Sequence, residues 1–263
     1  MDSKVALVTG GAQGLGAATA VALVTRGCSV AVADIDEAGA RRTAELCERL
    51  RPAVSVSARA FPIVVDLATP DGPQSMVDEA CRRLERLDVL INCAAYAPVE
   101  SFLEMTPKSW EAALLINVRA VALAMSAAGR VMVRQRSGHI VNVTSAAARM
   151  AVPNFATYAA TKAAVDALTR VGAVALGPHG VRVNGFSPGM MDTPMQESIE
   201  ARFARLEERS DVAAFKAERT ARVPLKRRTT PQEMAESLVW LALDSPSYMT
   251  AERLNVTGGL DKD

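Results

Sequence analysis

A tyrosine and a lysine in this sequence have the types and the spacing to move a proton together. Tyr158 and Lys162 are four residues apart in a strongly helical run, so one helical face carries both side chains. An ordinary phenol has a pKa of about 10, and a neighbouring ammonium group stabilises the phenolate. A pKa lowered by about three units, or roughly 4 kcal/mol, would suit Tyr158 to general acid/base catalysis near neutral pH. The alternative is a pair of surface neighbours without a catalytic role.

Glycines follow the first apolar run of the chain. Gly10, Gly14 and Gly16 form a TGxxxGxG pattern at an expected strand-to-helix junction, where the backbone must turn tightly and approach a ligand without Cβ atoms. The N-terminus of the following helix would face a pyrophosphate. Because such a string is a weak signal by itself, its context decides what it means.

The context includes an acidic residue at the end of the second expected strand. The carboxylate of Asp34 could accept both hydroxyls of an adenosine ribose and would repel a 2′-phosphate. Gln13 and the segment 35–38 contain no basic residue of the kind that a 2′-phosphate needs. The sequence therefore predicts NAD rather than NADP, although Asp34 could also, or instead, cap the helix that follows.

Two more strand ends carry residues expected beside such a cofactor. Asp66 follows the third expected strand and could contact adenine, although an Asp in this place is also a common helix cap. Asn92-Cys93-Ala94-Ala95 ends the fourth strand with small residues. They would let a backbone approach a ligand closely, but tight packing of a helix on the sheet would also use them.

Taken together, these segments resemble the classical short-chain dehydrogenase/reductase family over nearly the whole chain. The resemblance rests on motifs in the family's order and spacing, namely Thr9–Gly16, Asn92–Ala95, Asn117, Ser145, Tyr158–Lys162 and Ser187–Gly189. It implies that Tyr158 moves the substrate proton, and that Lys162 holds the nicotinamide ribose and lowers the pKa of Tyr158. Ser145 would hydrogen-bond the substrate oxygen, and Asn117 would anchor a water that links Lys162 to solvent. One departure is Asn-Cys-Ala-Ala at 92–95, where the family usually has Asn-Asn-Ala-Gly.

The resemblance also implies which residues contact the cofactor and the substrate. The expected NAD contacts are Gly10, Gln13, Gly14, Leu15, Gly16, Asp34, Ile35, Asp66, Leu67, Asn92, Ala94, Tyr158, Lys162, Pro188, Gly189, Met191 and Thr193. The expected substrate wall comprises Tyr96, Ala147, Arg149, Met150, Phe155, Met190, Met191 and Met195.

This wall is mostly apolar and rich in methionine, an adaptable side chain. It favours a secondary alcohol or ketone on an alicyclic, aromatic or otherwise largely apolar skeleton. Arg149 could bind a carboxylate or a hydroxyl-rich group, so a polyol or a hydroxy acid is an alternative substrate. A 3-oxoacyl-carrier-protein-type reductase, which has a similar scaffold, is another alternative. A catalytically silent NAD-binding scaffold is the non-enzyme alternative.

The elements that must position these residues alternate between apolar strands and amphipathic helices. This pattern predicts an α/β fold: a single-domain, Rossmann-type, doubly wound parallel sheet of about seven strands over residues 1–263, with helices on both faces. The expected strands are Val5–Thr9, Ser29–Asp34, Ala58–Val65, Val89–Asn92, His139–Thr144, Arg182–Phe186 and Arg253–Val256. The expected helices are Gly14–Arg26, Glu37–Arg51, Pro73–Arg86, Pro107–Arg134, Tyr158–Leu176 and Pro231–Leu243.

One segment, 190–223, departs from this alternation. It is long and rich in charge, and it follows a strand at the end of the sheet where ligands bind in such folds. We expect a substrate loop or lid here. The alternatives are a solvated helix pair or an oligomer contact.

Composition limits the remaining possibilities. Thirty Lys and Arg residues against 29 Asp and Glu residues give a formal net charge of +1, and aromatic residues make up 4%. Such a chain has neither the global field nor the stacking groups that nucleic acid needs. We expect no nucleic-acid or membrane partner, no metal, a cytoplasmic location and, from the family resemblance, a homotetramer.

Overall fold

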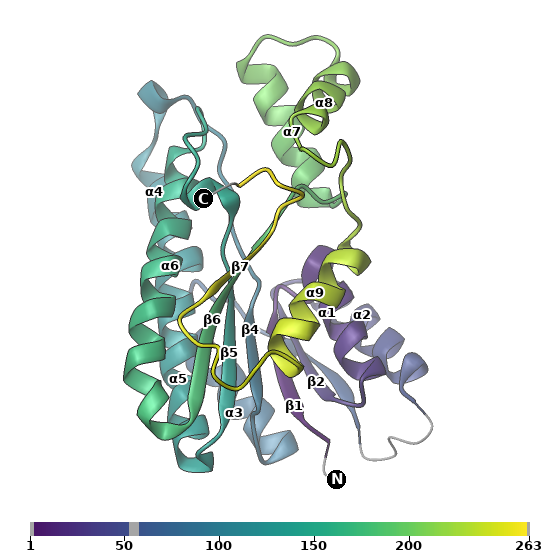
Figure 1. Cartoon of the computed structure of the whole chain (residues 1–263), viewed down its shortest axis with the longest axis vertical. Helices are drawn as coiled ribbons and strands as arrows, with labels where there is room; N and C mark the ends of the chain where they lie inside the picture. Colours follow the sequence, from purple (N-terminus) through teal and green to yellow (C-terminus); the bar gives the residue numbers. More distant parts are fainter. Residues whose placement is uncertain (1–2, 53–57, 262–263) are drawn as a thin grey trace.

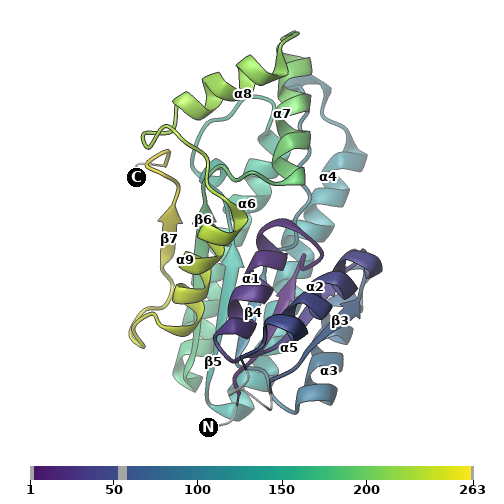
Figure 2. The ribbon, with the colours of Figure 1, turned by 90° about the vertical axis from the view of Figure 1, so that its right-hand side faces the viewer.

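Seven strands form one parallel sheet in the computed structural model, which describes residues 3–52 and 58–261 (Figure 1). The strands are β1 (Val5–Thr9), β2 (Ser29–Asp34), β3 (Ala60–Val64), β4 (Val89–Asn92), β5 (Gly138–Val143), β6 (Val181–Pro188) and β7 (Arg253–Val256). Their spatial order is β3-β2-β1-β4-β5-β6-β7, and Figure 2 shows β3 and β7 at opposite edges. The order reverses between β1 and β4, which is where a doubly wound sheet opens a crevice for ligands.

Helices cover both faces of the sheet. They are α1 (Gly14–Thr25), α2 (Glu37–Leu50), α3 (Gly72–Leu84), α4 (Pro107–Ala113), α5 (Ala120–Gln135), α6 (Ala156–Leu176), α7 (Pro194–Leu206), α8 (Val212–Ala221) and α9 (Pro231–Leu243). Helices α1, α2 and α9 pack on one face, and α3, α5 and α6 pack on the other. Helices α7 and α8 stand beyond the carboxyl ends of the strands (Figures 1 and 2). The expected Rossmann-type fold is confirmed.

The strands form where the sequence is continuously apolar. All five residues of β1 are buried, as are the first five of β2, because each strand is covered on both faces. The helices begin where capping residues stand. Thr106 and Thr230 accept hydrogen bonds from the backbone N–H groups of Ser109 and Glu233, and Pro107 and Pro231 occupy the first turns that follow.

Several boundaries differ from the expectation. The long helix expected over 107–134 is divided by a π-helical turn, Leu114–Arg119, between α4 and α5. Strand β6 continues to Pro188 because it pairs there with Val256 of β7. The third strand begins at Ala60 instead of residue 58, and residues 53–57 before it lie outside the described part of the chain.

The stretch Pro107–Gln135 is long and apolar enough to cross a membrane by length and composition. Half of its most apolar window is buried inside the protein. Helix α5, which supplies much of this stretch, packs against α3, α6 and the strands β4 and β5. A buried core helix passes the same test of length and composition.

A buried histidine links the sheet to the helix α9. The imidazole of His139 lies with Nδ1 3.1 Å from the carbonyl oxygen of Ala242, and Nε2 accepts a hydrogen bond of 2.9 Å from the amide of Asn184. A guanidinium nitrogen of Arg182 lies 3.1 Å from Nδ1. Burial, followed by the charge of Arg182, lowers the pKa of His139 to about 3.

This histidine makes the stability depend on pH. Between an unfolded pKa of 6.5 and a native pKa of about 3, the unfolded chain binds the proton and the native protein does not. We therefore expect the free energy of unfolding to decrease as the pH falls below about 6.5, by up to about 1.4 kcal/mol per pH unit from this group. Urea unfolding of the wild type and of His139→Gln between pH 7.5 and 4.5 tests this, since the variant should lose that part of the slope. Parallel stability curves for the two proteins would contradict it.

Candidate active site

A cavity of about 620 Å³ opens at the carboxyl ends of the central strands. It extends from the glycine loop after β1, past the ends of β5 and β6, to α6, α7 and α8. Most residues expected from the sequence line it: Gly10, Gln13, Gly14, Leu15, Gly16, Asp34, Ile35, Asp66, Leu67, Ala94, Ser145, Ala147, Met150, Phe155, Tyr158, Lys162, Pro188, Gly189, Met190, Met191, Thr193 and Met195. The fold thus brings most of the residues predicted to contact the cofactor, together with Ser145, Tyr158 and Lys162, to the wall of one cavity.

The glycine loop is so close to its surroundings that side chains would not fit. A Cβ atom on Gly16 would lie 2.1 Å from the carbonyl oxygen of Gly10, and a Cβ atom on Gly10 would lie 2.8 Å from the Cα of Ala94. Gly10 also has φ +68°, a conformation that favours glycine. The Thr9 hydroxyl accepts hydrogen bonds from the N–H groups of Cys93 and Ala94, so the ends of β1 and β4 are fixed together.

Asp34 has a double role at the end of β2. Its Oδ2 accepts a hydrogen bond of 2.9 Å from the Ala12 N–H, and its Oδ1 accepts one of 3.0 Å from the Asp36 N–H. The carboxylate therefore holds the glycine loop while it lines the cavity. The cap of α2 is Asp36, whose side chain accepts from the Gly39 N–H, so Asp34 does not serve that purpose.

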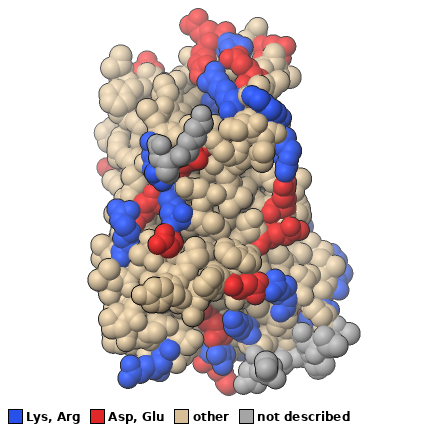
Figure 3. All heavy atoms as spheres, viewed as in Figure 1, with Lys and Arg blue, Asp and Glu red and all other residues tan. Residues whose placement is uncertain are grey.

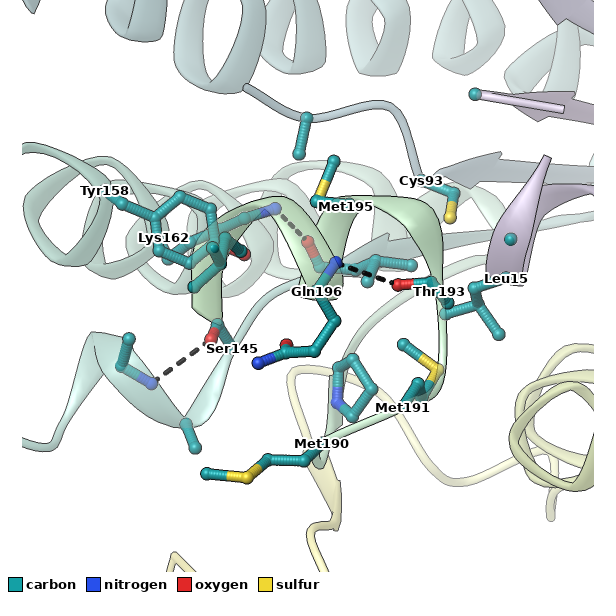
Figure 4. A pocket seen from close by; sticks show the side chains of 18 of the residues that line it. Leu15, Cys93, Ser145, Tyr158, Lys162, Met190, Met191, Thr193, Met195 and Gln196 are labelled. Atoms are coloured by element: carbon teal, nitrogen blue, oxygen red, sulfur yellow. Dashed lines mark hydrogen bonds between the residues drawn. The ribbon is translucent and has the colours of Figure 1, made fainter. Parts of the chain in front are cut away.

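Tyr158 and Lys162 lie on the opposite side of the cavity from Leu15 and Thr193 (Figure 4). The ammonium group of Lys162 is buried, with 2% exposure, and donates a hydrogen bond of 2.7 Å to the Val143 carbonyl at the end of β5. It stands 5.6 Å from the centre of the Tyr158 ring. Ser145 lies two residues beyond Val143, hydrogen-bonds the Tyr158 side chain and accepts from the Ala147 N–H at 3.2 Å. The end of β5 therefore brings the hydroxyl, the phenol and the ammonium group together.

The pKa of Tyr158 differs in direction from the sequence expectation. Burial raises it to about 12, and the hydrogen bond with Ser145 opposes this shift only in part. Burial also lowers the pKa of Lys162 to about 8. Spacing along a helix could not reveal this, because desolvation penalises the charged forms of both groups and depends on the surrounding fold.

Asn117 has a positioning role within the π-helical turn. Its Oδ1 accepts from the Tyr96 N–H at 2.8 Å, and its Nδ2 donates to the Tyr96 carbonyl at 2.8 Å and to the Thr161 hydroxyl at 2.9 Å. The fully buried amide thus connects the loop after β4 to α6, one residue before Lys162.

Four predicted site residues do not line the cavity. Asn117 and Asn92 are buried behind it, and the Asn92 amide donates to Asn142 on the neighbouring strand at 2.8 Å. Tyr96 is held through its backbone by Asn117 and lies outside the wall. Arg149 is exposed on the loop after β5, so the structure does not place the cation expected there in the cavity.

The segment 190–223 supplies a wall of the cavity that is only partly predictable from the sequence. Its helices α7 and α8 pack together through Phe203 and Phe215, which are each 1% exposed, and Phe203 contacts Phe155. Figure 4 shows Met190, Met191 and Met195 around Gln196. The lining residues Gln196, Arg219 and Arg222 were not predicted from the sequence. The charge of this segment was visible in the sequence, but which charges face the cavity depends on how the two helices pack.

The C-terminal strand supports the reacting centre from behind. Arg253 of β7 donates to the Ser145 carbonyl at 2.8 Å and to the Ser187 hydroxyl at 2.9 Å. The same guanidinium group pairs with Asp261 at 2.9 Å and with Asp166 of α6 at 3.4 Å. The position of Ser145 is therefore coupled to β6, β7 and α6.

Comparison with known proteins agrees with this geometry. A family model described as enoyl-(acyl carrier protein) reductase matches residues 10–261. The chain belongs to the short-chain dehydrogenase/reductase family. This family resemblance was expected from the motifs and is confirmed.

Similar family members include a 3-oxoacyl-(acyl-carrier-protein) reductase from Thermotoga maritima, 30% identical over 99% of this chain and 98% of the relative. A cis-4-hydroxycyclohexanecarboxylate dehydrogenase from Sinomonas cyclohexanicum is 36% identical over 97% of this chain and 96% of the relative. Among solved structures, an NAD⁺-bound xylitol dehydrogenase has a TM-score of 0.91 at 28% identity and covers 97% of this chain and 98% of its own. An actinorhodin polyketide ketoreductase with NADPH has a TM-score of 0.91 at 29% identity, and the match covers 100% of this chain and 98% of the ketoreductase chain. The short-chain dehydrogenase/reductase is thus an oxidoreductase of a family that acts on alcohols and ketones.

The raised pKa of Tyr158 predicts how the rate of this oxidoreductase depends on pH. Alcohol oxidation needs a deprotonated Tyr158 to accept the substrate proton, and a pKa of about 12 keeps that form scarce near neutral pH. We expect kcat/KM for oxidation to rise about tenfold per pH unit below about pH 8, and less steeply above it, where Lys162 loses its charge. Steady-state rates in both directions, with unfolding monitored at each pH, test this. An oxidation rate that is already independent of pH between 6 and 8 would show that the phenol ionises far below 12.

Proposed function

We propose that this short-chain dehydrogenase/reductase uses NAD to interconvert a secondary alcohol and its ketone on a largely apolar skeleton. The observation that carries this proposal is the placement of Asp34 and of the Ser145–Tyr158–Lys162 group at two ends of one cavity. The first end suits an adenosine ribose, and the second suits a reacting hydroxyl or carbonyl group.

The fit of a dinucleotide is supported by the glycine loop. A side chain at Gly10 or Gly16 would collide with backbone atoms. Without Cβ atoms, the backbone N–H groups of this loop remain accessible to a pyrophosphate. NAD is favoured over NADP because Asp34 lines the end of β2. Of the described Lys and Arg residues, those lining the cavity are Lys162, Arg219 and Arg222. They come from α6, from α8 and from the residue directly after α8, not from the neighbourhood of Asp34.

In the proposed mechanism, the chain's own residues handle the proton and the developing charge. The bound nicotinamide supplies the hydride acceptor or donor. In alcohol oxidation, Ser145 Oγ hydrogen-bonds the substrate oxygen, and the Tyr158 oxygen accepts its proton. Lys162, held by the Val143 carbonyl, adds positive charge next to the phenol. In reduction, Tyr158 returns the proton to the forming alkoxide.

The proposed skeleton follows from the wall opposite the glycine loop. Met190, Met195, Phe155 and Ile199 contribute apolar surface there. The Sinomonas relative is named as a dehydrogenase of cis-4-hydroxycyclohexanecarboxylate, which is consistent with an alicyclic substrate. A 3-oxoacyl-carrier-protein-type reductase is the second candidate, favoured by the relative from Thermotoga maritima.

The proposal extends to assembly and location. A homotetramer is supported by exposed apolar side chains on the outer side of α6, where Val171 and Val174 are 67% and 76% exposed. A cytoplasmic location remains a prediction from the sequence.

Cofactor choice provides the experimental test of the proposed function. NADH and NADPH formation is measured in parallel across cyclic, aromatic, polyol and hydroxy-acid alcohols. We expect kcat/KM for NAD to exceed that for NADP by about 100-fold or more, because Asp34 would repel the 2′-phosphate. Asp34→Ser should reduce this preference at least about tenfold.

The matched control is Asp36→Ser, which removes the cap of α2 but leaves the cavity wall intact. It should retain the cofactor preference of the wild type. A wild-type enzyme that prefers NADP would overturn the assignment of Asp34, and the absence of turnover with every alcohol and ketone would favour the silent scaffold.

A further inference from the structure

Two arginines, one on α8 and one directly after it, line the cavity far from the reacting centre. Arg219 and Arg222 are three residues apart and line the wall, yet the proposed proton transfer does not use them. The Arg222 side chain is 63% exposed and pairs with Glu218, as a surface arginine does. The Arg219 side chain is only 14% exposed, which is unusual for a guanidinium group and requires an explanation.

A continuous row of aromatic rings connects Arg219 with the catalytic tyrosine. The rings of Tyr158 and Phe155 stack with centroids 4.5 Å apart, and Phe155 meets Phe203 edge to face at 5.5 Å. The Arg219 guanidinium carbon lies 4.6 Å from the centre of the Phe203 ring. All four side chains line the cavity. The cavity therefore has a proton-transfer group at one end of an apolar row and a cation at the other.

The cation at this end is only partly neutralised. Glu200 is fully buried and is shared between two arginines, with Arg219 Nε and Arg228 Nη2 at 2.8 and 2.9 Å from its oxygens. One carboxylate against two guanidinium groups leaves an excess of one positive charge. Arg219 Nε, Glu200 Oε2 and Arg228 Nη1 are all buried without a hydrogen-bond partner in the described part of the chain. Uncompensated buried charge is costly, so the cluster favours an additional anion.

The neighbouring carboxylates do not provide this anion. Glu197 pairs with Lys216, and Glu218 pairs with Arg209 and Arg222. These pairs belong to the charged surface of α7 and α8 near the top of Figure 3. Glu207 also lines the cavity, but it is exposed and no described ion pair joins it to Arg219. Of the two wall arginines, the buried Arg219 is therefore the one with charge left for a ligand.

We propose that the substrate carries a carboxylate at the far end of its apolar skeleton and that Arg219 binds this carboxylate. This inference rests on the proposed function and specifies the substrate class of the same site. A single excess charge matches a monoanionic carboxylate better than a dianionic phosphate. The planar guanidinium, whose carbon lies over the Phe203 ring, is suited to the geometry of a carboxylate.

The test compares acids with neutral analogues of the same shape. The probes are cis-4-hydroxycyclohexanecarboxylate and 7-hydroxyoctanoate, each paired with its primary amide. We expect kcat/KM for at least one acid to exceed that for its amide about tenfold or more, and Arg219→Gln to bring this ratio to about one. Arg219→Lys, which keeps the charge, should restore part of the preference. The matched control is Arg209→Gln: Arg209 lies 5.3 Å from the Phe215 ring centre but does not line the cavity, so the wild-type ratio should persist.

A binding measurement separates this inference from the proposed function. The melting temperature is recorded with 7-oxooctanoate, 4-oxocyclohexanecarboxylate and their amides, in the presence and absence of NADH. Stabilisation by a keto acid but not by its amide, lost in Arg219→Gln and retained in Arg209→Gln, supports the inference even where no alcohol is oxidised. If alcohols are oxidised but acids and amides are equal in both rate and stabilisation, the carboxylate assignment is overturned while the dehydrogenase proposal stands. A folded Arg219→Gln variant that keeps the full preference for the acid overturns the assignment to Arg219.

Discussion

The hydrogen bond from the buried Lys162 ammonium to the Val143 carbonyl is the interaction on which the site depends. It joins α6 to the carboxyl end of β5, so that Tyr158 from the helix and Ser145 from the loop beyond the strand meet at one edge of the sheet. A buried ammonium group needs such a partner because desolvation disfavours its charge. The same burial lowers the pKa of Lys162 to about 8 and raises that of Tyr158 to about 12, which sets the pH range of the chemistry.

Much of the fold and half of the site could be predicted because their signals are local. β1, β2, β4 and β7 have the predicted bounds, since continuous apolar runs between helices specify buried parallel strands. The glycine spacing, Asp34 and the Tyr158–Lys162 pair are likewise visible in sequence. The direction of the Tyr158 pKa shift was not, because it depends on burial by distant segments. The cation of the substrate wall was predicted to be Arg149, whereas the structure places Arg219 there. Arg219 is held by contacts with Phe203 and Glu200, which only the packing of α7 on α8 creates.

The two ends of the cavity show how one scaffold can accept different substrates. The parts built on the sheet, including the glycine loop and the end of β5, are rigidly tied together by Thr9, Asn117 and Arg253. The opposite wall belongs to α7 and α8, whose Phe203 and Phe215 share a small apolar cluster with Phe155 and the partly buried Tyr158. Changes in these helices that keep Phe203 against Phe155 can therefore alter the substrate wall with little effect on Tyr158, consistent with the variety of substrates in the names of similar family members.

The most direct test of the account is the rate of NADH formation by Tyr158→Phe under single-turnover conditions. We predict a loss of about 1,000-fold or more at saturating NAD, because the proton acceptor is removed. Tyr248→Phe, a change at a fully exposed tyrosine, should keep the wild-type rate. A Tyr158→Phe enzyme with a rate close to that of the wild type would contradict the assignment of Tyr158 as the general acid/base.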